Sequence, residues 1–333
     1  ELTVLPFFNS ETFKVFYKDG SNFSKLRSVF GGLSKRFFQV FESRKYDLVF
    51  IQREAMLFGP AFFEVLFQKI GKCPIVLDLD DATYVSYVSP TYGKIGSFFK
   101  FFGKTDKLIK RSERVICGNR FIADYAEKKG AETLIVPTVV DTDKFKPLNK
   151  NNDVPVIGWI GTHSTFPLLE SVFPVLQKLA SEYEFVLKIV GAGRDNIQIK
   201  NVEVKNLEWN LEREIDDFQS LDIGLYPITT STSANTEWLM GKSGFKSIQY
   251  LAIGIPFVVT PFGVSAEIGV VGETHFEAVS GDDWYNSLSV LISDENLRKK
   301  MGRKGREYAI RNFTLDIQSE KIAQMLRDVL KFK

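Results

Sequence analysis

The stretch 241–269, GKSGFKSIQYLAIGIPFVVTPFGVSAEIG, combines a loop, a short helix, a tight Gly-Ile-Pro turn, a buried strand and a glycine loop. Phe245, Ile248 and Ala252 recur at three- and four-residue steps, which predicts one apolar helix face. Buried strands that alternate with helices are typical of a parallel, doubly wound sheet. We therefore expect an α/β fold built around this segment.

The polar residues of the same stretch predict an anion site. Lys242, Lys246 and Gln249 are spaced four and three residues apart and would share a second helix face. Ser243 is the expected N-cap, which would place both lysines around the first helical turn. That end of a helix is partially positive, so the two lysines would hold an anion such as a diphosphate. The alternative is a solvated lysine face on an amphipathic helix.

The remaining sequence alternates in the same way. Strands are expected over residues 2–7, 46–51, 74–78, 114–117, 134–137, 154–160 and 221–227, and a further strand is expected to end at residue 190. Helices are expected over residues 22–42, 54–70, 92–112, 120–129 (with Asn119 as N-cap), 166–181, two over 281–311, and 314–332. At 333 residues, two domains are the default. The polar segment 148–153 is the expected linker, giving domains over 1–148 and 149–313.

Composition is that of a globular protein, with an uneven distribution of charge. Residues 1–150 hold 24 Lys and Arg against 17 Asp and Glu, whereas the rest hold 19 against 24, and 20 of the 30 phenylalanines lie in the first part. Two halves of opposite charge indicate different partners. Cys73 and Cys117 each lie beside an apolar segment, which predicts buried free thiols in a reducing, cytoplasmic compartment.

Several motifs carry a resemblance to a known family. Residues 248–259, IQYLAIGIPFVV, followed by Gly263 and Glu267, resemble the donor-site motif of retaining glycosyltransferases of family 4. The match is closer to a bacterial branch with the pattern GKCxFKxxQYMAxGxPVV. Residues 136–147 resemble the segment that ends the first domain of that family. The family's two motif glutamates fall on Gly241 and Gln249, so the first is absent and the second is an amide.

This resemblance implies a GT-B fold, in which two Rossmann-like domains face a cleft and the last helix, 314–332, packs back on the first domain. Relative to the family, the N-terminal domain lacks its first strand, loop and helix. Both an active and an inactive chain are therefore compatible with the sequence. The implied activity is that of a retaining, metal-independent transferase. It would move a sugar from a nucleotide sugar to a carbohydrate or lipid-linked acceptor, in polysaccharide or glycolipid biosynthesis. No cofactor or nucleic acid is implied.

The resemblance also assigns site residues. The expected catalytic residues are Asp80, Asp81, Lys242 and Lys246. The expected donor-binding residues are Gly161, Thr162, Ser164, Thr165, Gly191, Gly193, Gln249, Gly263 and Glu267. On the acceptor side we expect Glu54 and Asp78. Small residues after a strand, as in Gly161–Thr165, let backbone N–H groups approach a phosphate. Trp209 would flank the nucleotide base or lie in the core.

Other function classes remain open at this stage. The main alternative is a non-catalytic GT-B subunit that binds sugar nucleotides or forms a complex, and Gly241 favours it. Asp78-Leu79-Asp80 has the form of a metal-binding D-x-D motif, but we expect no metal site. Paired carboxylates could also serve glycoside hydrolysis. A dehydrogenase is disfavoured because no G-x-G-x-x-G opens a βαβ unit.

The phenylalanines of the first half suggest a membrane contact. Phe98, Phe99, Phe101 and Phe102 surround Lys100. A second group, beside Lys35 and Arg36, consists of Phe30, Phe37, Phe38 and Phe41. One interpretation is that these side chains form the core and the lysines are solvated. The other is peripheral docking on the anionic inner face of the plasma membrane.

Overall fold

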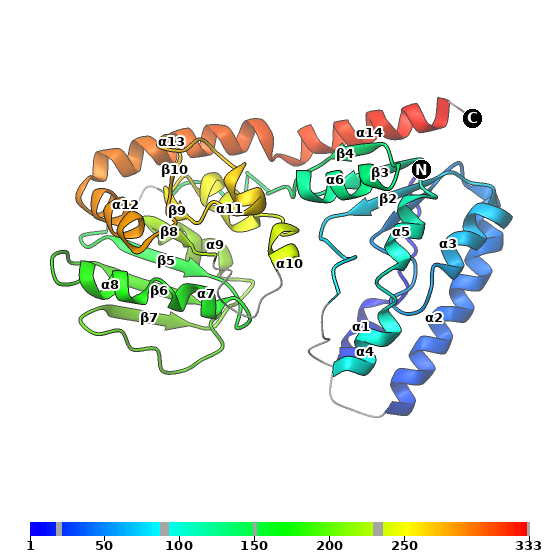
Figure 1. Ribbon diagram of the computed structural model, residues 1–333, viewed down its shortest axis with the longest axis horizontal. Coiled ribbons are helices and arrows are strands. Elements are labelled where there is room, and N and C mark those ends of the chain that lie inside the picture. The colour runs from blue at the N-terminus through cyan, green and yellow to red at the C-terminus, as the bar shows by residue number, and fades with distance from the viewer. Residues whose placement is uncertain (18–21, 87–92, 149–151, 229–235, 332–333) are drawn as a thin grey trace. The chain divides into compact units, whose positions relative to one another are not determined.

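The computed structural model describes residues 1–17, 22–86, 93–148, 152–228 and 236–331 (Figure 1). Contacts divide the chain into two compact units. The first unit comprises Glu1–Val136 with Ala323–Lys333, and the second comprises Pro137–Ile322. These bounds differ from the expected 1–148 and 149–313, because the segment after Val136 makes its contacts in the second unit. Within the described residues, none of the helices has the length and apolar content needed to cross a membrane.

The first unit contains a parallel sheet of order β1-β2-β3-β4. Its strands are β1 (Val49–Gln52), β2 (Ile75–Leu79), β3 (Arg114–Cys117) and β4 (Thr133–Ile135). Its helices are α1 (Ser10–Tyr17), α2 (Asn22–Glu42), α3 (Phe62–Leu66), α4 (Gly93–Lys100), α5 (Lys104–Ile109) and α6 (Arg120–Lys128), with short turns η1 (Ser43–Lys45) and η2 (Phe67–Gly71). The predicted N-cap is confirmed, since the Asn119 side chain accepts a hydrogen bond from the Ile122 N–H at 2.9 Å.

Three predicted elements of this unit are wrong. Residues 1–6 form no strand, and Leu2 and Val4 are exposed, because no neighbouring strand pairs with them. The helix expected over 54–70 begins only at Phe62. The helix expected over 92–112 is two helices, α4 and α5, because Phe101 takes a left-handed conformation (φ 52°) that ends the first one.

The second unit contains a six-stranded parallel sheet of order β10-β9-β8-β5-β6-β7. Its strands are β5 (Val156–Ile160), β6 (Val186–Val190), β7 (Glu203–Leu207), β8 (Ile223–Tyr226), β9 (Phe257–Val259) and β10 (His275–Glu277). Its helices are α7 (Phe166–Glu170), α8 (Phe173–Leu179), α9 (Glu214–Gln219), α10 (Thr236–Met240), α11 (Phe245–Ile253), α12 (Gly281–Ser293) and α13 (Glu295–Asn312), with a short turn η3 (Gly263–Ala266). Helix α14 (Leu315–Lys331) runs from this unit into the first.

Each face of the second sheet buries its own apolar cluster. Ile157 and Trp159 of β5 contribute to one cluster, together with side chains of α7, α8 and α12. Ile160 contributes to the other cluster, together with Phe218 of α9 and buried residues of α11. Because successive side chains of a strand point to opposite faces, this division follows from the strand period of two. The predicted doubly wound α/β architecture, with two parallel sheets, is confirmed.

The described cysteines behave as predicted. Cys73 and Cys117 are both buried and form no disulfide with each other. Burial raises the pKa of the Cys117 thiol to about 12. A thiol with so high a pKa is not a nucleophile near neutral pH, which agrees with a structural role.

Candidate nucleotide site

The turn after β5 presents backbone N–H groups and hydroxyls. The Thr162 carbonyl accepts hydrogen bonds from the N–H groups of Thr165 (2.9 Å) and Phe166 (3.0 Å). The Thr162 hydroxyl lies 2.9 Å from the Ser164 hydroxyl and 3.3 Å from that of Thr165. Within the described residues, the N–H groups of His163 and Ser164 donate to no partner in the chain. The predicted turn therefore leaves two backbone donors available to a ligand.

Two glycines of the next turn fit tightly against this one. Gly191 has a φ of 82°, and a Cβ there would lie 2.3 Å from the Gly161 carbonyl oxygen. Gly193 has a φ of 66°, and its Cβ would lie 2.9 Å from that of His163. The structure thus brings the predicted glycines of both turns together. Glycine is required at positions 191 and 193 because the two turns approach closely and because φ is positive. Trp209 lies against Gly191 and is 48% exposed, so its placement in the core is wrong.

The start of α11 differs from the prediction. The N-cap is Gly244, in a left-handed conformation (φ 63°) and without a side-chain cap, whereas Ser243 was expected there. Lys242 precedes the helix, and its ammonium lies 3.7 Å from the centre of the Trp238 ring. Lys242 therefore does not share a helix face with Lys246. The αL turn at Gly244 breaks the periodicity that the spacing of these lysines suggested.

Lys246 belongs to a largely buried polar group inside the second unit. Its ammonium donates to the Gln249 Oε1 at 3.3 Å, and the Gln249 amide donates to the Glu214 carboxylate at 3.4 Å. The Gln249 side chain is fully buried. Burial lowers the pKa of Lys246 to about 8, and the charge of Glu214 offsets part of this effect. No carboxylate lies within ion-pair distance of Lys246 in the described parts of the chain. Lys246 itself is half-buried, and a half-buried cation without a paired anion favours the binding of an anionic ligand.

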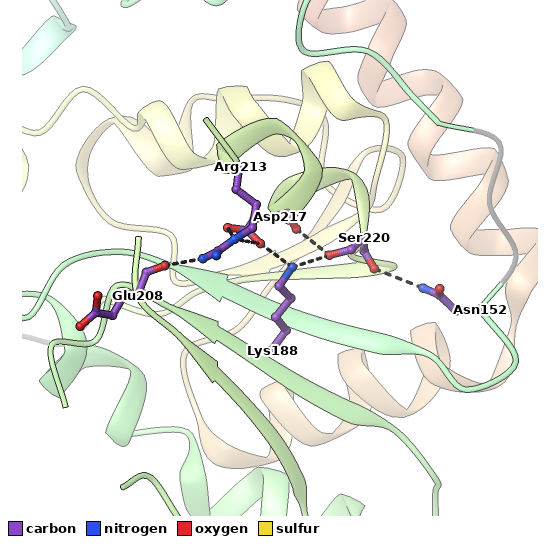
Figure 2. A network of polar contacts seen from close by, with 6 residues as sticks. All are labelled: Asn152, Lys188, Glu208, Arg213, Asp217 and Ser220. Atoms are coloured by element: carbon purple, nitrogen blue, oxygen red, sulfur yellow. Dashed lines mark hydrogen bonds and ion pairs between the residues drawn. The ribbon is translucent and has the colours of Figure 1, made fainter. Parts of the chain in front are cut away.

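Helix α9, which carries Glu214, is held by a buried ionic network (Figure 2). Asp217 is 2% exposed and accepts from the Lys188 ammonium at 2.7 Å and from the Arg213 Nε at 3.0 Å. Lys188 also donates to the Ser220 hydroxyl at 2.8 Å, and Arg213 donates to the Glu208 carbonyl at 2.5 Å. The network ties the first turn of α9 to β6 and thereby positions Glu214. Sequence reasoning missed it because its members come from separate elements.

The glycine loop after β9 packs on the segments before and at the start of α11. Gly263 has a φ of 57°, and a Cβ there would lie 3.1 Å from the Met240 Cα. A Cβ on Gly244 would lie 2.5 Å from the Ile268 side chain. Glu267 is exposed. The structure thus joins the loop of Gly263 and Glu267 to the segment that contains Lys242.

Strand order explains why these pieces belong to one site. β5 lies between β6 and β8, so the chain leaves it in one direction and later returns on its other side. In open α/β sheets ligands bind at the carboxyl ends of the strands, where the strand order reverses. The turns after β5 and β6, and the segment that leads from β8 to α11, all follow carboxyl ends of these strands.

The acids of the first unit lie at the carboxyl ends of β1 and β2. Arg53 has a φ of 60° and donates two hydrogen bonds to the Asp80 carboxylate, both at 2.5 Å. It also lies 3.3 Å from Asp81. Burial, and then the charge of Asp80, raise the pKa of Asp78 to about 6. Arg53 therefore occupies both oxygens of Asp80, which is the second acid of the D-x-D motif. Among the described residues, no group of three metal-ligating side chains was found.

Glu54 is in a different environment from these acids. Its side chain is 9% exposed and pairs with the ammonium groups of Lys100 (2.6 Å) and Lys104 (2.5 Å). Lys104 is itself buried and also donates to the Met56 carbonyl at 2.6 Å. Two ion pairs leave Glu54 less available to an acceptor hydroxyl than the half-buried Asp80 and Asp81.

Solved structures with a similar fold are glycosyltransferases. HepE from Anabaena, in complex with UDP, matches with a TM-score of 0.67 at 14% identity, over 89% of this chain and 82% of HepE. A glycosyltransferase from Rickettsia africae matches with a TM-score of 0.67 at 16% identity, over 95% and 84%. Sucrose-phosphate synthase from Thermosynechococcus elongatus matches with a TM-score of 0.62 at 14% identity, over 92% and 80%.

No protein-family model and no curated protein sequence matches the chain. Structural likeness at these identities establishes the fold, which is that of the GT-B glycosyltransferases.

Proposed function

We propose that the chain transfers a sugar from a nucleoside-diphosphate sugar to an acceptor hydroxyl. The observation that carries this proposal is the Lys246 ammonium, half-buried beside Gln249 and Glu214 without a paired anion. A leaving nucleoside diphosphate is the anion that a transferase must stabilise, and fixed cations and N–H groups do so best. Two proteins of the same fold point the same way, since HepE was solved with UDP-glucose and a TarM variant with UDP and α-GlcNAc-glycerol.

The proposed roles follow from position. As the bond between the anomeric carbon and the diphosphate oxygen breaks, Lys246 would neutralise the charge that gathers on that oxygen. The N–H groups of His163 and Ser164 would donate to the same phosphates. Gln249 would hold the ribose, and Trp209 would lie beside the base. Lys242, Gly263 and Glu267 remain donor-site candidates on the neighbouring loop.

We further propose that transfer retains the anomeric configuration and needs no metal ion, as the resemblance to family 4 implies. The acceptor oxygen would then bond to the anomeric carbon on the face that the diphosphate leaves. Its proton would pass to a phosphate oxygen of the donor. Asp80 and Asp81 would orient acceptor hydroxyls. The acceptor we propose is a carbohydrate or lipid-linked carbohydrate of polysaccharide or glycolipid synthesis, at the inner face of the plasma membrane.

The alternative is a GT-B subunit that binds the sugar nucleotide without turnover. Gly241 favours it, because the related motif has a glutamate at that position. The side chain of glycine is a single hydrogen atom, which cannot take the role of a glutamate carboxylate. The two functions share the binding site and differ only in chemistry.

A turnover assay with a panel of nucleotide sugars tests the proposal. We expect release of nucleoside diphosphate from one donor, unchanged by excess EDTA and strongly reduced in Lys246→Ala. Lys299→Ala, which removes an exposed lysine of α13, is the matched control and should match the native rate. Binding without release would establish the alternative. If none of the donors bound or reacted, the assignment would be wrong.

A further inference from the structure

Helix α2 exposes a row of large apolar side chains. A surface helix normally buries its apolar face. In α2, six large apolar side chains are exposed, by 45–75%: Phe23, Leu26, Phe30, Phe37, Phe38 and Phe41. Most of them recur at steps of three, four and seven residues, so they form one stripe along the helix. This stripe is the outward face of a 21-residue helix about 30 Å long.

The opposite side of α2 is the one packed on the unit, and it mixes the buried Val40 with buried polar side chains. Arg36 and Gln39 are 9% and 4% exposed, and the Arg36 guanidinium donates to the Gln39 side chain at 2.9 Å. It also donates to the Leu5 carbonyl at 3.0 Å. Gly32 lies on this side too, with the Phe7 ring at 3.0 Å from the position of a Cβ. The packed side is therefore fixed by contacts, and α2 cannot turn its phenylalanines inward without breaking them.

The charges next to the stripe are mostly positive. Helix α2 contains Lys25, Arg27, Lys35 and Arg36 and a single acid, Glu42, at its last residue. Arg27 and Lys35 are exposed. Each precedes an exposed phenylalanine by three residues, Phe30 and Phe38 respectively, and residues three apart are neighbours on a helix surface. The face thus presents aromatic rings flanked by cations.

We propose that this face of α2 docks on an anionic lipid bilayer, with the helix parallel to the surface. Phenylalanines enter the boundary between headgroups and acyl chains, and Arg27 and Lys35 pair with lipid phosphates. A second copy of the chain fits the face less well, because pairing two such helices would bring their cations together with a single acid, Glu42, at the end of each helix to compensate. Docking does not depend on the proposed sugar transfer, and vesicle binding measures it without turnover.

Sedimentation of the full chain with vesicles tests the proposal. We expect binding to phosphatidylcholine vesicles that contain phosphatidylglycerol, little binding to phosphatidylcholine alone, and release at high salt. Phe30→Ser with Phe37→Ser should weaken binding at least about tenfold, since each loses apolar area that the bilayer would bury. Phe62→Ser removes a ring that is 51% exposed on α3, outside the stripe, and should bind like the native chain.

Charge is tested in the same assay. Arg27→Glu with Lys35→Glu should lower binding about tenfold or more. Lys69→Glu with Lys128→Glu changes the net charge equally at exposed positions outside α2, and should have a smaller effect. An unchanged melting temperature in each variant shows that folding is intact. Three results would each overturn the proposal: no binding to anionic vesicles at low salt, equal losses in variants and controls, or a dimer in solution that the phenylalanine substitutions abolish.

Discussion

The two units differ in where they place their phenylalanines. In the second unit Phe166, Phe218 and Phe257 are fully buried, and Phe218 packs against Tyr250 at 5.6 Å between ring centres. Within the described residues, every exposed phenylalanine belongs to the first unit. Both units bury charged side chains, Arg36 and Lys104 in the first and Asp217 in the second. The difference between the units therefore concerns the phenylalanines, which reach the surface in the first unit.

The comparison predicts opposite costs for the same substitution. Phe218→Ala should lower the free energy of unfolding of the second unit by about 3–5 kcal/mol, because it opens a cavity between α9 and α11. Phe37→Ala, at a position 45% exposed, should change stability by no more than about 0.5 kcal/mol. Chemical denaturation of each variant measures both values. Equal losses would mean that the outward face of α2 is part of a core.

Charged pairs should differ in the same sense. Asp217→Ala leaves Lys188 and Arg213 without their buried partner, and we expect a loss of about 3–5 kcal/mol. Asp80→Ala removes an exposed pair with Arg53 and should cost about 0–1 kcal/mol. Because Asp217 holds the helix of Glu214, the first variant should also weaken nucleotide binding. If Asp217→Ala left stability unchanged, the network of Figure 2 would not stabilise the second unit.

Two glycine substitutions distinguish the effect of a close backbone contact from the effect of a positive φ alone. Gly191→Ala should cost about 1–3 kcal/mol and abolish nucleotide binding, since its Cβ would meet the Gly161 carbonyl at 2.3 Å. Gly272 has a similar φ of 75° but nothing within 4 Å of its Cβ, so Gly272→Ala should cost about 1 kcal/mol and leave binding intact. Thermal denaturation with and without UDP distinguishes the two. Normal UDP binding by Gly191→Ala would exclude this turn from the site.

Sequence reasoning succeeded where the signal is local. The apolar runs of β5, β8 and β9, and the turn at Gly161–Thr165, were found because strand period and turn residues lie within a few positions. The contact between Gly191 and Gly161 could not be predicted in detail, because it depends on the pairing of two strands. Gln249 was predicted to bind ribose, but its neighbour Glu214 lies 35 residues away in sequence and carries no motif.

Which face of α2 packs on the unit could not be predicted from the sequence either. The spacing of Phe30, Phe37 and Phe41 defines a stripe but not the side that packs. That side was decided by Arg36 and Gln39, whose partners include the backbone at Leu5. The core interpretation of these phenylalanines is wrong, as it is for Phe98 and Phe99, which are 74% and 53% exposed.

The pKa of Lys246 gives a pH dependence with a defined sign. Its value in the folded chain, about 8, lies below the ordinary 10.5, so the unfolded chain binds more protons between these values. Stability should therefore rise with pH across this range, and Lys246→Met should abolish that rise. Only the protonated ammonium attracts a diphosphate, so affinity for UDP should fall by up to about tenfold per pH unit above 8. Constant affinity between pH 7 and 9.5 would contradict the lowered pKa.

The central claim is that Lys246 is the cation that holds the diphosphate. Calorimetry of UDP and of uridine with the native chain and Lys246→Ala tests it most directly. If another donor base is found, its nucleoside and nucleoside diphosphate replace these ligands. A charge-assisted contact to phosphate contributes about 1.5–3 kcal/mol, so UDP should bind roughly 10- to 150-fold more weakly to the variant, while uridine binds equally to both. Equal losses for the two ligands, or an undiminished affinity for UDP, would contradict the claim.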